Sequence, residues 1–403
     1  MFAAVSGVLV LHDMPCSAGH PELAEAAASP LLTPSTADAP VAPVPLEMRL
    51  EALPRHAPEP PNNRSSPAKI VLGRMLFFDP ILSATREVAC ATCHHPSLGW
   101  TDQRATPIGV GAAGLGPERI IRRATGLPVP RRNTPTLLNV AFNGLVAGVK
   151  ANPAGAPMFW DSRARSLESQ ALVPIQSPSE MLGERAERIT ALPAAVERLV
   201  KIPGYRRSFR LAFPAGTGEA ITPANIGRAI AAFERMLTTP DTPFDRFLRG
   251  ATNALTDLQK RGLRVFSESG CVQCHGGPML SDFKPHFIGA PDSGPDSRVP
   301  LRTPTLRNLK HTAPYMHNGR LRTLNDVFTF YEQLMDSVSE TLDGGDDTAQ
   351  PPLDPLLKHL TLSPEDFPAL EAFLDSLNAV DYDATVPATV PSGLPVAGVD
   401  ASD

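Results

Sequence analysis

The sequence predicts a mainly helical protein built from two domains of similar design. Three observations carry this prediction. Several stretches place apolar residues at helical spacing behind a capping residue. No run of alternating strand-like residues is long enough to predict a sheet. A helix followed by a Cys-x-x-Cys-His run occurs twice, with the runs at residues 90–94 and 271–275.

The composition agrees with a globular protein of this size. A chain of 403 residues with 42% hydrophobic and 20% charged residues is long enough to fold into two domains with substantial cores. The net charge of −5 gives no reason to expect nucleic acid or an anionic membrane as a partner.

The first domain is predicted to open with a helix. Ser66 is a capping residue, Pro67 suits the first helical position, and Asp79-Pro80 ends the helix just before the first Cys-x-x-Cys-His run. Residues 108–132 are rich in Gly, Pro and Arg and predict a long surface loop. A second helical region is expected over residues 160–170.

The next helices follow the same rules. One runs from Pro223 to Leu237 behind Thr222, and another opens with a capping box at Thr256. Pro and Gly residues between them, at 238–252, predict the domain boundary. We therefore divide the chain into an N-terminal segment (1–62), a first domain (63–248), a second domain (249–383) and a C-terminal tail (384–403).

Each Cys-x-x-Cys-His run predicts one covalently bound c-type haem, since the thiols add across the haem vinyl groups and the His ligates the iron. The residues concerned are Cys90, Cys93 and His94, and Cys271, Cys274 and His275. Two accidental matches are not expected, because even one would arise about once in a thousand such sequences. The alternative is a single zinc site made by the four thiols, which gives the two histidines no role.

Because bacteria attach c-type haem outside the cytoplasm, we expect a periplasmic protein. Phe2 to Leu11 form an apolar run too short to span a bilayer, and the first basic residue is Arg49, so no secretory signal can be recognised and the true start is expected upstream. Cys16 leaves a lipid anchor open, although the residues before it are a poor lipoprotein signal. We otherwise expect the first 62 residues to be a signal or tail segment that is rich in Pro and Ala.

From about Ser66 to Leu377 the chain resembles the bacterial di-haem cytochrome c peroxidases and their relatives MauG and MbnH. Besides the two haem-attachment runs, the shared motifs are Leu76-Phe77-Phe78-Asp79-Pro80, Asn133-Thr134-Pro135-Thr136, Phe159-Trp160-Asp161, Gln170 with Glu180, Ala232-Phe233-Glu234-Arg235, Thr303-Pro304-Thr305-Leu306-Arg307-Asn308 and Ala313-Pro314-Tyr315-Met316-His317-Asn318-Gly319. The resemblance implies two cytochrome c-like domains, with a peroxide-reacting haem at His94 and an electron-storing haem at His275.

The resemblance also implies roles for residues that would otherwise be treated as structural. Trp160 would relay electrons between the haems, whereas an isolated Trp in an apolar segment is more often part of a core. Asn133, Thr312 and Pro314 match positions that hold a calcium ion, the last two through backbone carbonyls, as a hard cation requires. By itself, Asn133 would be interpreted as a turn residue.

Glu180 would serve the cleavage of peroxide. A carboxylate at the open face of the iron can take the proton from the near oxygen and deliver one to the far oxygen. Gln170 would hold the peroxide or a water beside it, and Pro174 would line the same face. Without the resemblance, Glu180 would be interpreted as a carboxylate at a helix start.

Two departures from the peroxidase branch bear on mechanism. Many members carry a His that blocks the reactive iron, and Val110 stands in its place here, so we expect an open first haem. At the second haem, Tyr331 stands where the peroxidase branch has an axial Met, as in MauG and MbnH. Met335 is the rival ligand, and Met316 and Met279 are weaker candidates.

These expectations lead to an oxidoreductase that uses hydrogen peroxide as a two-electron oxidant. The electrons would come from a small donor protein, a cytochrome c or a cupredoxin, or from Trp or Tyr residues of a partner protein, as with MauG. A di-haem electron carrier without catalysis is the alternative from another class. A homodimer stays open, because the sequence does not indicate the oligomeric state.

Overall fold

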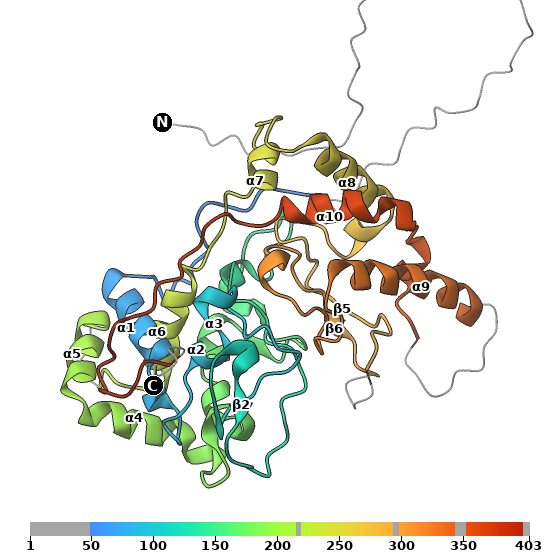
Figure 1. Cartoon of the computed structure of the whole chain (residues 1–403). Coiled ribbons are helices and arrows are strands. Elements are labelled where there is room, and N and C mark those ends of the chain that lie inside the picture. The colour runs from blue at the N-terminus through green and yellow to red at the C-terminus, as the bar shows by residue number, and fades with distance from the viewer. Residues whose placement is uncertain (1–48, 215–218, 293–297, 343–351, 398–403) are drawn as a thin grey trace, which may run out of the picture.

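The structure, a computed structural model, describes residues 49–214, 219–292, 298–342 and 352–397. The longer α-helices are α1 (Pro67–Phe78), α4 (Ala191–Lys201), α5 (Pro203–Ala212), α6 (Pro223–Glu234), α8 (Asp257–Glu268), α9 (Leu324–Leu342) and α10 (Phe367–Asp375), and the shorter ones are α2 (Cys90–Cys93), α3 (Leu167–Gln170) and α7 (Pro243–Leu248). Figure 1 shows α1, α4, α5 and α6 grouped together, with α7 to α10 in a second group. None of the described helices is long and apolar enough to cross a membrane.

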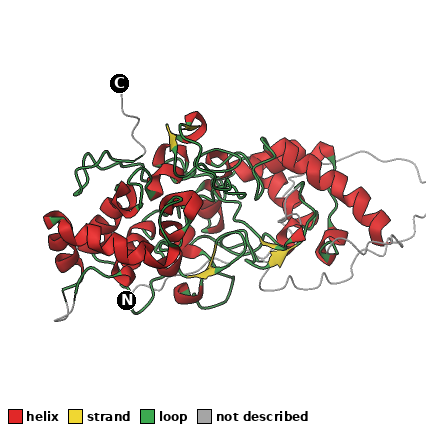
Figure 2. Ribbon diagram, turned by 90° about the horizontal axis from the view of Figure 1, so that it is seen from below, coloured by secondary structure: helices red, strands yellow, loops and turns green. Residues whose placement is uncertain are grey.

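Strands are short and few in the described residues, so the prediction of a mainly helical fold is confirmed (Figure 2). They form three antiparallel hairpins, namely β1 (Ala112–Ala113) with β2 (Ile120–Ile121), β3 (Pro157–Met158) with β4 (Ala164–Arg165), and β5 (Pro285–His286) with β6 (Leu301–Arg302). The region 160–170, expected to be helical, holds the turn of the second hairpin, β4 and only the single turn α3.

The helices begin where the sequence predicts. Ser66 caps α1 by accepting a hydrogen bond from the backbone N–H of Lys69, and Thr222 caps α6 in the same way. The capping box of α8 joins Thr256 and Gln259 reciprocally. These local bonds satisfy backbone donors that a helix leaves unpaired, which is why the boundaries could be predicted from sequence.

Each half contains one close helix crossing, and the two crossings are of the same kind. A Cβ at Gly73 of α1 would lie 2.0 Å from the carbonyl oxygen of Ala229 in α6, and a Cβ at Gly262 of α8 would lie 1.9 Å from that of Ala369 in α10. Only glycine permits this approach. The helix before each haem-attachment run is thus packed in the same way on a later helix of its own half.

Each half has its own aromatic core. In the first, the Trp100 ring packs edge-on against Phe77 and Phe233, with both centroid distances at 5.7 Å. In the second, the Phe373 ring contacts Phe244 at 5.2 Å and Phe266 at 5.0 Å. Phe244 belongs to α7, which the division by sequence placed at the end of the first domain.

The segments expected to be tails contribute to both cores. Leu50 is buried in the second core, and Val390 is buried in the first. Near Val390, the Ser392 hydroxyl donates a hydrogen bond of 2.7 Å to the buried carboxylate of Asp79. Composition concealed this packing because Pro-rich extended segments have no helical or strand period.

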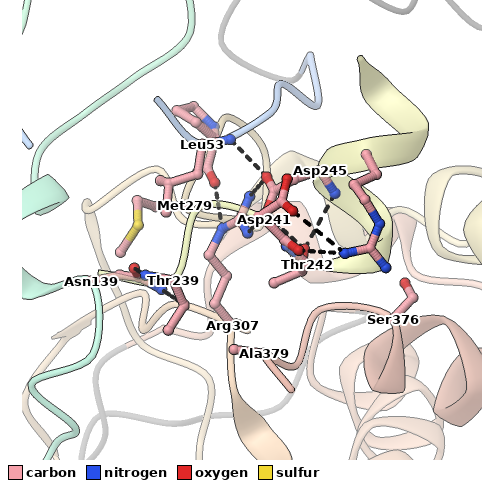
Figure 3. Close-up of polar contacts among 12 residues, drawn as sticks. Leu53, Asn139, Thr239, Asp241, Thr242, Asp245, Met279, Arg307, Ser376 and Ala379 are labelled. Atoms are coloured by element: carbon pink, nitrogen blue, oxygen red, sulfur yellow. Dashed lines mark hydrogen bonds and ion pairs between the residues drawn. The ribbon is translucent and has the colours of Figure 1, made fainter. Parts of the chain in front are cut away.

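A buried polar network joins the halves (Figure 3). The hydroxyl oxygen of Thr239 accepts hydrogen bonds from the amides of Asn139 (2.7 Å) and Asn308 (3.0 Å), which occupy equivalent places in the two halves. Nearby, Arg307 pairs with Asp245 through two N–O contacts of 2.9 Å, and both side chains are fully buried. Asp245 also accepts a hydrogen bond from the N–H of Leu53.

Candidate active site

A cavity of about 820 Å³ is lined by residues of both halves and by every residue that the sequence singled out for haem attachment or catalysis. These residues are Cys90, Cys93, His94, Cys271, Cys274, His275, Gln170, Pro174, Glu180, Trp160 and Tyr331. The three residues expected at a calcium ion, Asn133, Thr312 and Pro314, line it as well. The fold therefore gathers into one place side chains that lie far apart in the sequence.

His94 follows the single turn α2 and is held by its Nδ1, which donates a hydrogen bond of 3.1 Å to the backbone carbonyl of Trp100. Trp100 has a positive φ of 59°, and its side chain is completely buried in the first core. Burial lowers the pKa of His94 to about 4. The ring is therefore neutral at pH 7, with Nε2 left to bind a metal.

His275 repeats this arrangement. Its Nδ1 donates a hydrogen bond of 2.9 Å to the carbonyl of Leu280, which also has a positive φ, and burial lowers its pKa. The residue before each carbonyl is anchored by a threonine: Thr136 donates to Gly99 at 2.6 Å, and Thr305 to Met279 at 2.7 Å. The two Thr-Pro-Thr motifs thus orient the two histidines.

The cysteines fit haem attachment and not zinc. All four are free, and burial raises the pKa of the Cys90 thiol to about 12, with the Glu234 carboxyl adding to the shift. Among the described residues, no three or more His, Cys, Asp and Glu side chains are grouped so that they could hold a metal ion, so the structure does not bring the four thiols together as the zinc alternative requires. Each half instead offers two thiols and one oriented imidazole to the cavity, as a covalently bound haem requires.

Glu180, Gln170 and Pro174 lie on short turns and line the same cavity as the first haem-attachment run. Gln170 ends α3, Pro174 begins a 3₁₀ turn, and Glu180 is in a five-residue π-type turn (Pro178–Leu182). Burial raises the pKa of Glu180, and the Arg163 guanidinium and the Ser177 hydroxyl oppose the shift. Arg163 stacks on the Phe159 ring at 3.6 Å.

Val110, which stands at the place of the blocking His, is buried in the first core. The sequence contains no His between Pro96 and Cys274. No histidine of that segment can therefore approach the face that Glu180 lines.

Trp160 lies in the turn between β3 and β4 and contacts both halves. Its indole Nε1 donates a hydrogen bond of 2.9 Å to the carbonyl of Asn133, and its own carbonyl accepts one of 2.8 Å from the N–H of Arg302. Sequence reasoning placed this residue in a helix. The structure places it at a position from which it reaches both sides of the cavity.

Tyr331 projects from α9 to the cavity wall near the second haem-attachment run. Burial raises its pKa, and the neighbouring Cys274 and Cys271 thiols add to the shift. Met316 also lines the cavity, whereas Met335 and Met279 do not. Met279 lies instead in a separate buried cluster with Leu53 and other apolar residues.

Sequence reasoning missed three charged groups at this site. Glu234 is buried on the cavity wall, and burial raises its pKa to about 8. His286 lies between Asp282 (2.9 Å) and Asp354 (2.6 Å), and its hydrogen bonds, the one to Asp282 first, raise its pKa to about 11. Arg119 is buried beside the first haem-attachment run. Of the three, only Glu234 lies in a motif that the sequence had singled out.

Comparison with known proteins identifies this site. The family model of the di-haem cytochrome c peroxidases matches residues 67–253. The methylamine utilization protein MauG of Methylorubrum extorquens is 35% identical over 347 residues, which cover 83% of this chain and 85% of that protein. The chain belongs to the di-haem cytochrome c peroxidase family.

The chain is also similar to three further proteins. The cytochrome c peroxidase Ccp of Escherichia coli is 38% identical over 276 residues, covering 64% of this chain and 51% of that protein. A crystal structure of a MauG-like protein associated with microbial copper homeostasis has a TM-score of 0.62 and 26% identity, over 81% of this chain and 95% of that chain. The di-haem peroxidase BthA of Burkholderia thailandensis has the same fold, with a TM-score of 0.58 over 87% of this chain and 95% of that one.

Membership in this family means that the chain is a peroxide-dependent oxidoreductase with two c-type haems. The predictions of fold class, family and enzyme class are confirmed. The roles of individual side chains stay predictions, although the structure gathers all of them around one cavity.

Proposed function

We propose that this enzyme carries out MauG-like chemistry, in which peroxide drives the oxidation of Trp or Tyr residues of a partner protein. The observation that carries the proposal is Tyr331, which lines the cavity in place of the axial Met of the peroxidase branch. A hard, anionic phenolate favours the higher oxidation states of iron, whereas a thioether stabilises Fe(II). Such a site suits an enzyme that holds oxidising equivalents rather than one that stores electrons.

At the first site, a haem bound through Cys90 and Cys93 would supply the iron at which peroxide is reduced. Glu180 would take the proton of the nearer peroxide oxygen and deliver it to the farther one, which leaves as water. Its burial supports this role, because a carboxyl with a raised pKa accepts a proton more readily than an exposed carboxyl does and can return it. Gln170 and Pro174 would position the peroxide and restrict the space around it.

Trp160 would carry electrons between the two sites. Its ring lines the cavity, and its hydrogen bonds to Asn133 and Arg302 fix it between the halves. At the second site His275 and Tyr331 would provide the two axial ligands, which closes that site to peroxide. This inequality between the sites supports catalysis rather than plain electron transfer by two closed haems.

The proposal is tested by mixing the diferric protein with stoichiometric peroxide and following both haem spectra. We expect a rapid reaction without prior reduction and a long-lived product oxidised by two electrons, with changes at both haems. A bis-His spectrum for the first haem, or a lack of reaction before reduction, would contradict the open site.

The second candidate function is peroxide detoxification, with a small cytochrome c or a cupredoxin as the electron donor. The 38% identity to the E. coli cytochrome c peroxidase favours it, as does the set of Trp160, Gln170 and Glu180, which both branches share. Fast turnover only when the donor is added, with no long-lived oxidised state, would support this candidate over the first. We place either activity in the periplasm, where c-type haem proteins of bacteria are assembled.

We also propose a calcium ion between the two sites, held by Asn133 and by the backbone carbonyls of Thr312 and Pro314. The amide nitrogen of Asn133 donates to the carbonyl of Arg104 at 2.7 Å, which leaves its amide oxygen as a donor atom for a hard cation. All three residues line the cavity. Removal of calcium with a chelator should perturb the two haem spectra together, and readdition should restore them.

A further inference from the structure

Arg119 is a buried cation held by backbone carbonyls. The residue is 4% exposed, and its three guanidinium nitrogens donate to the carbonyls of Ile108 (2.6 Å), Gly109 (2.6 Å) and Gly114 (3.1 Å). No carboxylate of the described chain lies within ion-pair distance of it. A buried guanidinium is costly unless its donors are satisfied, so this carbonyl cage fixes the course of residues 108–114 tightly.

A second arginine, Arg104, binds the backbone carbonyls that directly follow this segment. One guanidinium nitrogen of Arg104 donates to the carbonyls of Gly116 (3.1 Å), Pro117 (3.0 Å) and Arg119 (3.0 Å). Strand β1 lies within the segment that Arg119 contacts, and β2 follows the carbonyls that Arg104 contacts. The Arg-rich excursion, which the sequence predicted to be a surface loop, is thus anchored internally.

The segment held by Arg119 presses against the backbone of Glu180. A Cβ at Gly109 would lie 2.1 Å from the carbonyl oxygen of Ser179, 2.5 Å from that of Glu180 and 2.7 Å from the Glu180 Cα. Such contacts leave no space for a side chain, so Gly109 fits directly against the turn that carries Glu180. The carbonyl of Gly109 is the one that receives the Arg119 bond of 2.6 Å.

The turn of Glu180 depends on contacts from outside. It is five residues long, too short to be stable by itself. The first contact is made by the N–H of Ala84 and the hydroxyl of Ser83, which donate to the carbonyl of Met181 at 3.0 and 2.8 Å. The second is the close approach of Gly109 to the backbone of Ser179 and Glu180. A carboxylate that transfers the protons of peroxide must stay within hydrogen-bond distance of the peroxide. The contact with Gly109 is therefore as important for the Glu180 turn as the hydrogen bonds to Met181.

We propose that Arg119 is a positioning residue, which holds the Glu180 carboxylate at the peroxide-binding face by fixing Gly109 against the Glu180 turn. The inference rests on the proposed role of Glu180. It assigns to Arg119 a part in the reaction although its guanidinium contacts only backbone. The same contacts keep Val110, the residue after Gly109, in the first core.

The first test measures the second-order rate of the diferric holoenzyme with peroxide. Relative to the wild type, R119M should lower the rate roughly 10-fold to 100-fold, since a misplacement of about 1 Å has effects of this size, and R119K should recover part of the loss. In an E180Q background the same R119M change should have little further effect, because the group it positions is gone. An equal loss in both backgrounds would overturn the proposal.

The second test does not depend on activity. Hydrogen exchange of the holoenzyme should be faster in R119M over residues 108–114 and 178–182, with unchanged haem content and an unchanged spectrum of the second haem. R249M is the matched control, because Arg249 also donates to a backbone carbonyl, that of Leu53, but in the other half. Unchanged exchange at 178–182 in R119M would overturn the coupling. If the wild-type protein does not react with peroxide, the proposed function is wrong. The hydrogen exchange of residues 178–182 in R119M still decides whether Arg119 holds the Glu180 turn.

G109A provides an independent variant in which Arg119 is retained. Its Cβ must displace the backbone of Ser179 and Glu180, so we expect the same loss of peroxide rate and the same local increase in exchange. A G109A protein with the wild-type rate and exchange would show that the Glu180 turn does not depend on this contact.

Discussion

Trp160 donates a hydrogen bond from its indole nitrogen to the backbone carbonyl of Asn133, over 2.9 Å. The bond joins the proposed electron relay to a residue of the proposed calcium site. Because the carbonyl of Trp160 is bonded to Arg302 in the second half, the relay is held from both sides. A substitution of Asn133 is therefore expected to alter the position of Trp160 as well as the binding of calcium.

The replacement W160F tests the relay. An aromatic ring is kept but the indole and its N–H are lost, so we expect the first haem to react with peroxide as before, while the second haem responds at least roughly 10-fold more slowly. Stopped-flow spectra at the bands of the two haems measure both steps. F209L is the control, because Phe209 is buried in the first core and does not line the cavity, so its loss should affect stability only. Equal responses of the second haem in W160F and wild type would exclude the relay role.

The replacement Y331M tests the second axial ligand. A thioether favours Fe(II), so the reduction potential of the second haem should rise by on the order of 100 mV, within the range that axial ligands control. Potentiometric titration with spectra of each haem measures the shift. M335L should leave both spectra unchanged, because Met335 does not line the cavity. An altered spectrum in M335L and none in Y331M would reverse the assignment.

The pH dependence of the peroxide reaction tests Glu180. Burial raises its pKa, so the carboxylate that accepts the peroxide proton is lost as pH falls through this raised value. We expect the rate of the diferric enzyme to fall below that pKa and to level off above it. E180Q should be slower by about 10²-fold to 10⁴-fold, with no such inflection. Retention of the inflection in E180Q would assign it to another group, for which Glu234, with a pKa of about 8, is the first candidate.

Local signals explain how much of this structure could be predicted from sequence. Ser66-Pro67 and the Thr256 capping box mark helix starts through bonds within a few residues, and both are confirmed. The Cys-x-x-Cys-His runs fix the chemistry of attachment by spacing alone. The gathering of Glu180, Trp160 and Tyr331 around one cavity came from the family resemblance, not from periodicity.

The features that sequence could not supply depend on distant partners. Leu258 is 48% exposed although its helical spacing from Gly262, Val265 and Phe266 predicts that it shares their apolar stripe, because the position of α10 decides which face is covered. Arg119 lies in a stretch whose composition is typical of a surface loop. It can be buried only because the folded chain brings the backbone carbonyls of Ile108, Gly109 and Gly114 to its guanidinium. Val390 is apolar in a Pro-rich segment, where no period indicates burial.

The last prediction concerns stability and the ion pair of Asp245 with Arg307, which are both fully buried. D245N leaves the guanidinium without its charge partner, so the free energy of unfolding should fall by about 3–5 kcal/mol. D241N is the matched control: the Asp241 side chain is 53% exposed in its pair with Arg246, and its loss should cost less than about 1 kcal/mol. Denaturant unfolding of the holoenzyme, followed by circular dichroism, compares the two.

The same pair predicts how stability depends on pH. Arg307 holds the pKa of Asp245 below its ordinary value despite the burial that opposes this shift. The pair therefore contributes its full stability above the pKa of the unfolded chain and loses it as pH falls through the lower folded value. Between neutral and acidic pH, the wild type should lose more stability than D245N, so their difference narrows. A constant difference across this range would mean that D245N destabilises the protein through packing and hydrogen bonds rather than through the charge of Asp245.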